Sequence, residues 1–330
     1  MMEPHVRSRV LALIYPIEEH VGHWACSGEL LEIRRIIMST PDARNQIVYE
    51  IENFKPEVIA VCGKAAIEYL DMLDNLALEI PSISKIPRVF RMQNSSLLLQ
   101  SEKTEYSKQL CLDLSLWFRL ASDPRWSWIF VQTLDDVEIV RKHLAPVPVS
   151  ACPYGYDTAV FDPNLPELDR ETDVGCYMNL RGDSGRLELV TRAEEICRRR
   201  GWTFRFTEGV YWHDYARQIR SSKIALHKSI HSEVPFRMYE TTVFGTVFLT
   251  DPLKAHVEEL FEENYEYMTY KQDFSNLEDV LEKLLTNESL RLAIGENGRE
   301  RARQYTWQAV ADRYVAPALK IVAGMGRCNG

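Results

Sequence analysis

Two charged residues, Arg237 and Glu240, stand inside an otherwise apolar segment, Phe236–Asp251 ("FRMYETTVFGTVFLTD"). The spacing of its apolar residues predicts a short helix followed by a buried strand. Pro235 suits the first turn of a helix, and Gly245 can adopt the left-handed conformation that ends one. Arg237 and Glu240 are three residues apart, so on a helix their side chains would lie close to each other. They therefore form either a solvated ion pair or part of a binding site.

The flanking segments favour a site. They have the pattern of buried strands, so the helix between them is expected to be covered, and a covered carboxylate needs a partner. A ribose diol offers two hydroxyl donors to one carboxylate and would satisfy Glu240.

Histidines in two loops are further candidates. His20, His23 and Cys26 in "HVGHWACSG" have a spacing of three, but a fourth zinc ligand is not evident. We expect this loop to follow the first strand and to point into a cleft, where His23 would act as a base or orient a hydroxyl. His227, just before the Glu240 helix, would contact a sugar or phosphate. For both His23 and His227 the alternative is a structural loop histidine.

The elements that must position these residues alternate between strand and helix patterns, which predicts an α/β protein with largely parallel sheets. In the first half, the expected strands are 9–15, 57–63, 86–92 and 127–133, and the expected helices are 28–38, 46–54, 65–73 and 134–144. In the second half, the expected strands are 173–180, 202–208, 223–229, 246–251 and 266–271, and the helices are 186–201, 215–222, 235–245, 253–261 and most of 276–323.

A proline-rich stretch between Pro146 and Asp173 separates the two halves and is expected to lie outside the sheet cores. We therefore predict an N-terminal domain at 1–152, a linker at 153–172 and a C-terminal domain at 173–330, with the last helix packing back on the N-terminal domain. Ligands of open parallel sheets bind beyond the carboxyl ends of the strands, so a cleft between the domains is the expected site.

The composition is that of a globular protein, with 45% hydrophobic and 26% charged residues. The net charge of −9 gives no support to a general nucleic-acid binder, although it is compatible with one local basic cleft. No apolar run has the length of a membrane span, and the first apolar run is interpreted as a strand rather than a signal peptide. The seven cysteines are scattered without a Cys-x-x-Cys motif, which indicates reduced thiols and a cytoplasmic location.

The second half resembles a known family. The segments 221–251 ("SSKIALHKSIHSEVPFRMYETTVFGTVFLTD") and 267–314 ("YMTYKQDFSNLEDVL…WQAVADRY") are similar to the C-terminal nucleotide-sugar domain of GT-B glycosyltransferases. The segment 152–163 ("CPYGYDTAVFDP") is similar to the P-x-G-x-D-x-x-x-F-x-P linker of that family. The resemblance is closest to the CgeB-like branch, related to glycosyltransferase family 4, and it implies two Rossmann-like domains that face each other across a cleft. The first half shares only the strand–helix alternation.

The resemblance assigns roles to individual residues. Glu240 corresponds to the glutamate that holds the donor ribose, and Arg237 to the arginine near the diphosphate or sugar. Arg186, with Arg181 as a second candidate, corresponds to the arginines that meet the diphosphate, unless they are ordinary surface charges. The loop Gly182–Gly185 would add backbone N–H groups at the start of a helix, where anions bind.

One position departs from the family. Many relatives have a second glutamate eight positions before the ribose-binding one, and here that position is Ser232, with Glu233 beside it. Either Glu233 takes its place or this chain contacts the sugar differently.

The resemblance implies a hexosyltransferase that moves a sugar from a nucleotide-diphosphate sugar, with UDP-sugar favoured, to a hydroxyl acceptor with retention at the anomeric carbon. The chain has no Asp-x-Asp motif, and arginines with a helix N-terminus can stabilise the leaving diphosphate, so we expect no metal and no cofactor. The acceptors considered are a glycan, a protein, a small molecule or, least favoured, a modified base in phage DNA. The alternatives are a non-catalytic GT-B binding or assembly protein and a nucleotide-sugar epimerase of the same architecture.

Overall fold

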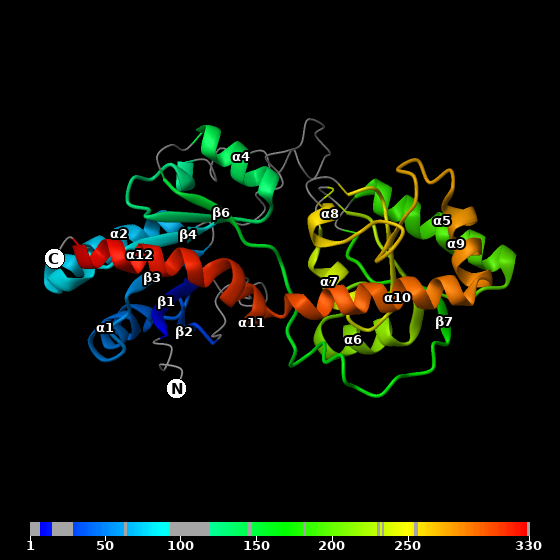
Figure 1. Ribbon diagram of the computed structural model, residues 1–330, viewed down its shortest axis with the longest axis horizontal. Coiled ribbons are helices and arrows are strands. Elements are labelled where there is room, and N and C mark those ends of the chain that lie inside the picture. Colours follow the sequence, from blue (N-terminus) through cyan, green and yellow to red (C-terminus); the bar gives the residue numbers. More distant parts are fainter. Residues whose placement is uncertain are drawn as a thin grey trace, which may run out of the picture. The chain divides into compact units, whose positions relative to one another are not determined.

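The computed structural model describes residues 7–14, 29–62, 65–92, 119–143, 147–180, 183–229, 232, 234–253 and 257–328. The chain forms two compact units (Figure 1). Unit 1 contains the described residues up to Pro153 together with those from Trp307 onward, and unit 2 contains the described residues of Tyr154–Thr306.

Unit 1 is built on a six-stranded parallel sheet with the strand order β2-β1-β3-β4-β5-β6. The strands are β1 (Ser8–Ile14), β2 (Leu31–Ile37), β3 (Val58–Cys62), β4 (Arg88–Arg91), β5 (Trp128–Val131) and β6 (Val149–Ala151). The helices are α1 (Ala43–Asn53), α2 (Ala66–Glu79), α4 (Leu134–His143), α11 (Trp307–Val310) and α12 (Ala316–Cys328), with a 3₁₀ turn at Pro81–Lys85. Every residue of β3 is buried, as expected for a parallel strand covered on both faces.

The helix predicted at 28–38 is wrong, because this segment forms strand β2. It pairs with β1 in parallel from Leu31 to Ile37. The leucines and isoleucines of the segment fit a helical spacing, but three of them are β-branched and suit a pleated surface next to a fully buried strand. β2 is an edge strand, so Arg34 and Arg35 remain exposed while Leu31 and Ile36 are buried.

The proline-rich stretch also departs from the prediction at its start. Val149–Ala151 forms β6, the last strand of the first sheet, although the stretch was expected to lie outside the sheet cores. Prolines are tolerated there because β6 is an edge strand and follows Pro148 directly.

Unit 2 contains a five-stranded parallel sheet with the order β11-β10-β9-β7-β8. The strands are β7 (Thr172–Cys176), β8 (Phe204–Phe206), β9 (Ser222–Leu226), β10 (Val247–Thr250) and β11 (Met268–Thr269). The helices are α5 (Ser184–Arg200), α6 (Trp212–Arg220), α7 (Phe236–Thr242), α8 (Val257–Leu260), α9 (Leu277–Thr286) and α10 (Glu288–Ala302). The two sheets with covering helices confirm the predicted α/β class.

Glycines let α10 approach the turn after α7. Gly245 has a φ of 69°, the left-handed conformation predicted for the end of this helix. Gly295 lies against the carbonyl oxygen of Gly245 so closely that a Cβ on it would overlap this oxygen. Gly298 lies close to Glu266, since a Cβ there would be 2.6 Å from the Glu266 carbonyl oxygen. The absence of side chains at these positions therefore sets how near α10 comes to the sheet.

The C-terminal segment completes unit 1. α12, drawn in red in Figure 1, packs against β1 and β3 and buries Leu319 and Val322. Just before it, the Asp312 carboxylate accepts hydrogen bonds from the backbone N–H groups of Glu29 (2.8 Å) and Leu30 (3.0 Å). Within the described ranges, no helix is both long and apolar enough to cross a membrane.

Candidate functional site

The carboxyl ends of β7, β9 and β10 gather polar side chains in unit 2. β9 leads through His227 and Lys228 towards α7, β10 is followed directly by Asp251, and β7 leads towards the start of α5. Because these strands are parallel and adjacent, their carboxyl ends meet at one edge of the sheet, which is where open α/β sheets bind ligands.

Glu240 lies on α7, one turn after Arg237, and its side chain is partly buried. Burial raises the pKa of the Glu240 carboxyl from 4.5 to about 7, and the positive charge of Arg237 offsets part of that rise. No ion pair or hydrogen bond joins the two side chains in the part of the chain that the structure describes. The solvated ion pair considered from the sequence is thus not what the structure shows.

Arg237 packs on α6 instead. Its guanidinium carbon lies 5.8 Å from the centre of the Tyr215 ring, a cation–π arrangement. Its Nε is buried and has no hydrogen-bond partner among the described residues. Tyr215 is buried too, and burial raises the pKa of its hydroxyl, with Arg237 acting in the opposite direction. Arg237 therefore brings a positive charge into a largely apolar contact beside Glu240.

His227 is buried at the end of β9. Its backbone N–H donates to Leu249 (2.8 Å), and the Tyr270 hydroxyl donates to its carbonyl (2.7 Å). The pKa of the imidazole is well below 6.5, first because of burial and then because of the charges of Arg186, Arg237 and Lys228. His227 is consequently neutral at pH 7, and three cations surround it.

Arg186 ties two loops together at the start of α5. Its Nε and one terminal nitrogen donate to the Lys228 carbonyl (3.0 and 2.8 Å), and its other terminal nitrogen donates to the Asn179 carbonyl (2.7 Å). Its backbone N–H donates to the Asp183 carboxylate (2.8 Å), which caps α5. Arg186 is buried, so these bonds hold the loops after β7 and β9 in a fixed relation. Its contact with a diphosphate remains a prediction.

Lys228 and Asp251 were not singled out from the sequence. The Lys228 ammonium lies 3.3 Å from one carboxylate oxygen of Asp251, and both side chains are mostly buried. The other oxygen accepts from the Ser229 N–H (2.8 Å) and the Thr250 hydroxyl (3.0 Å). Lys228 also lies across the first turn of α5, since a Cβ on Gly185 would be 2.7 Å from its Cε. The signal in the sequence was a charged residue within two positions of the end of each of two buried strands.

The remaining candidates, His23, Arg181, Gly182 and Glu233, lie outside the described residues, as do His20 and Cys26. Their roles remain predictions. Within the described ranges, no group of three or more His, Cys, Asp or Glu side chains could hold a metal ion.

Chemically, this edge offers one partly buried carboxyl with a raised pKa, a neutral histidine and three cations close to that histidine. The carboxyl can accept hydrogen bonds from hydroxyl groups once it is ionised. The cations and the N-terminus of α5 create a positive potential that suits phosphate groups.

Comparison with known proteins locates the same region. Residues 178–316 match the model of the family described as "Glycosyl transferase-like". A comparison with the sequences of curated proteins gave no match.

Among solved structures, sucrose-phosphate synthase from Thermosynechococcus elongatus has a TM-score of 0.62 at 9% identity, over 98% of this chain and 100% of that chain. HepE of Anabaena, in complex with UDP-glucose, has a TM-score of 0.60 at 9% identity, over 96% and 99%. A glycosyltransferase from Rickettsia africae has a TM-score of 0.54 at 12% identity, over 97% and 98%. At such low identities the likeness shows the fold.

Proposed function

From the premise that this chain has the GT-B fold and carries a glycosyl transferase-like domain at residues 178–316, we propose that it is an enzyme that transfers a sugar from a UDP-sugar to a hydroxyl acceptor. The choice of UDP is supported by HepE, whose structures contain UDP-glucose, or UDP and glucose. The closer placement in the CgeB-like branch is part of the proposal and is supported by the motifs alone.

The observation that carries the proposal is the state of Glu240. The Glu240 carboxyl is partly buried, makes no ion pair with Arg237, and has a pKa of about 7. Its ionisation therefore costs more free energy than that of a carboxyl on the surface. Two hydroxyl donors from a ribose would favour its ionised form, because hydrogen bonds to a carboxylate stabilise the charge. Glu240 is in this proposal the group that binds the nucleoside.

The diphosphate would lie between α7 and the start of α5. Arg237 and Lys228 supply positive charge, and the N-terminus of α5 supplies backbone N–H groups. Arg186 positions Lys228 by holding its carbonyl. Such fixed charges can stabilise the leaving diphosphate as its negative charge develops, so the proposal includes transfer without a metal ion, together with retention at the anomeric carbon.

On the acceptor side, we assign the general base to His23. It would take the proton of the acceptor hydroxyl, a role supported by its position in the sequence after β1. A glycan, a protein or a small molecule is the proposed acceptor class, with a hexose as the transferred group. Cys152, Cys176 and Cys197 are buried and form no disulfide in the described part of the chain, which supports the proposed cytoplasmic location.

The test is a donor panel. Purified protein is incubated with UDP-, GDP- and TDP-glucose, with and without EDTA, and both thermal stabilisation and release of the nucleoside diphosphate are measured. We expect UDP-glucose to stabilise and to be hydrolysed slowly, equally in EDTA. Glu240→Ala should lose the stabilisation by UDP-glucose, whereas Glu194→Ala, on the exposed face of α5 in the same unit, should keep it. No stabilisation by any nucleotide would refute the proposal. Mass spectrometry of products formed in a cell extract would then identify the acceptor.

A further inference from the structure

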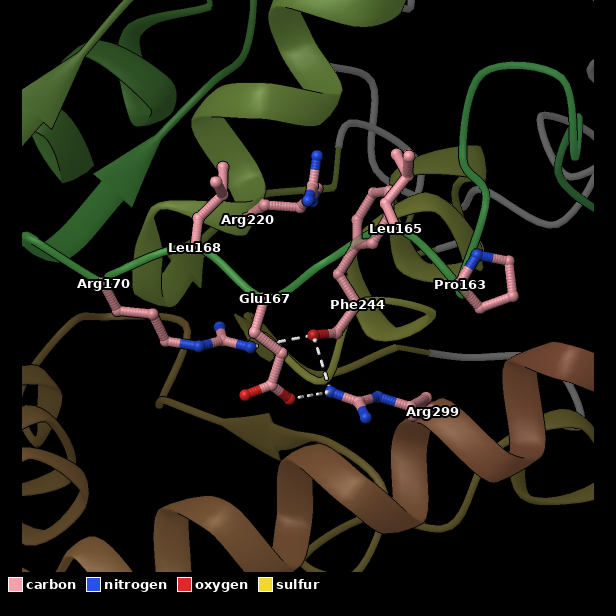
Figure 2. Close-up of a pocket in the computed structure, with 8 residues that line it drawn as sticks. All are labelled: Pro163, Leu165, Glu167, Leu168, Arg170, Arg220, Phe244 and Arg299. Atoms are coloured by element: carbon pink, nitrogen blue, oxygen red, sulfur yellow. Dashed lines mark hydrogen bonds and ion pairs between the residues drawn. The ribbon is translucent and has the colours of Figure 1, made fainter.

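A second concave site lies at the opposite edge of the unit 2 sheet, near the amino ends of β7, β9 and β10. This pocket has a volume of about 40 Å³. Arg170 precedes β7, Arg220 ends α6 and Arg299 lies on α10, and all three line the pocket (Figure 2). Its carboxylate is Glu167, and its apolar walls include Leu165 and Phe244.

Arg170 has a structural role in this pocket. It donates to the Ser222 carbonyl (2.6 Å), the Thr246 hydroxyl (2.7 Å) and the Phe244 carbonyl (2.8 Å). It thereby fastens the segment before β7 to the amino ends of two other strands. The pKa of Arg170 is lowered to about 10, first by burial and then by the charge of Arg299, whereas Glu167 acts in the opposite direction. The pocket lining contains three arginines and one carboxylate, so positive charge is in excess there.

Arg299 and Arg220 are less fully engaged. Figure 2 shows Arg170 and Arg299 both reaching the Phe244 carbonyl oxygen, to which Arg299 donates at 3.2 Å. The Nε of Arg299 is buried without a hydrogen-bond partner among the described residues. Arg220 donates to the Pro166 carbonyl and lies 5.6 Å from the centre of the Phe244 ring. Both guanidiniums keep donors that the described protein groups do not use.

The carboxylate of Glu167 is a weak partner for these cations. Its oxygen lies 3.5 Å from a terminal nitrogen of Arg299, at the limit of a hydrogen bond, and its side chain is 87% exposed. Arg299 has a second partner in Glu296, 3.2 Å away, which is also largely exposed. Exposed pairs of this kind contribute at most about 1 kcal/mol, so a better anion can displace Glu167.

We propose that this pocket binds a phosphate dianion, either as inorganic phosphate or as the phosphate of a small phosphomonoester. Its volume is about three times the ~10–15 Å³ that one water needs, which suits a compact anion. Guanidinium groups bind phosphate oxygens through two parallel N–H donors, a geometry that a lysine cannot supply. The apolar walls at Leu165 and Phe244 would lie beside the organic part of an ester. Glu167 is the internal competitor of the anion.

The test is titration of the full chain with inorganic phosphate by isothermal calorimetry, at constant ionic strength adjusted with sodium chloride. We expect saturable binding. Glu167→Gln should strengthen it about three- to tenfold, because the competing charge is removed while an exposed side chain leaves the fold unchanged. Arg220→Gln should weaken it at least about tenfold. Arg199→Gln, an exposed arginine at the end of α5, is the matched control and should leave the affinity unchanged.

Two further arms separate this pocket from the carboxyl edge of the sheet and distinguish the two sources of phosphate. Lys228→Gln should not change the phosphate affinity, because Lys228 lies at the opposite ends of the strands. If glucose 6-phosphate and inorganic phosphate bind with equal affinity, the pocket recognises the anion alone. If glucose 6-phosphate binds more tightly, the ligand is a phosphate ester. The proposal is overturned if neither compound saturates, if Arg199→Gln weakens binding as much as Arg220→Gln, or if Lys228→Gln abolishes binding and Arg220→Gln does not.

Discussion

Replacing Glu240 by glutamine should make the protein more stable at neutral pH and a poorer nucleotide binder. The folded protein holds the proton of Glu240 more tightly than the unfolded chain, because burial raises its pKa from 4.5 to about 7. Ionisation therefore opposes folding. The opposition is absent below pH 4.5, grows between pH 4.5 and pH 7, and is complete above pH 7.

The size of this effect follows from the two pKa values. The interval from 4.5 to about 7, at about 1.4 kcal/mol per pH unit, gives about 3 kcal/mol. Solvent contact of the partly buried side chain reduces this to about 2 kcal/mol. Glu240→Gln carries no such titration, so its free energy of unfolding, relative to the natural protein, should rise by about 2 kcal/mol from pH 4.5 to pH 8.

Binding should change in the opposite direction. An amide is a weaker acceptor than a carboxylate, and hydrogen bonds to charged groups contribute about 1.5–3 kcal/mol, so UDP affinity at pH 8 should fall by about tenfold or more. The difference should shrink at pH 5, where Glu240 is protonated. Urea unfolding at pH 5 and pH 8 and calorimetric titration with UDP measure both effects, with Glu194→Gln as the control. Parallel stability profiles from pH 5 to pH 8 would refute the burial argument, and unchanged UDP affinity at pH 8 would refute the ribose assignment.

Three further predictions concern the framework of unit 2. Gly295→Ala should destabilise the protein by about 1–3 kcal/mol, because its methyl group would overlap the Gly245 carbonyl; Gly324→Ala, with open space around it, should not lower the melting temperature in calorimetry. Asp183→Ala should lower the free energy of unfolding in urea by about 1 kcal/mol, through loss of the N-cap of α5, and an unchanged value would contradict the capping role. Arg170→Gln should destabilise by about 3 kcal/mol, because three acceptors lose a charged donor, and a change below about 1 kcal/mol in the same assay would show that solvent replaces it.

Most helices and strands of unit 2 could be predicted from the sequence. Val247–Thr250 is a short apolar run rich in β-branched and aromatic residues, and it forms the buried strand β10. The expected helix 186–201 ends at a glycine, and in the structure Gly201 caps α5 with a φ of 72°, the left-handed conformation. In unit 1, by contrast, β2 could not be told from a helix by spacing alone, because its pairing with β1 depends on residues more than twenty positions away.

Some residues of the candidate site could be predicted from local sequence signals, and others depend on long-range contacts. Glu240 and Arg237 were found because two charges inside one apolar segment are a local signal. Lys228 and Asp251 meet only because β9 and β10 are neighbours in the sheet, and strand order is a long-range property. Arg186 was recognised as important, but its three bonds to backbone carbonyls depend on where the loops after β7 and β9 come together.

The packing of α12 against β1 and β3 has a consequence for folding during translation. A ribosome makes β1 before the residues Tyr154–Thr306 of unit 2, and it makes α12 only after them. During translation the nascent first sheet would have an uncovered apolar face, while the later unit already has every strand it requires. A chain halted at Thr306 should consequently bind a chaperone through the uncovered face of the unit 1 sheet. The chaperone should be released once α12 has been made and Leu319 and Val322 cover that face.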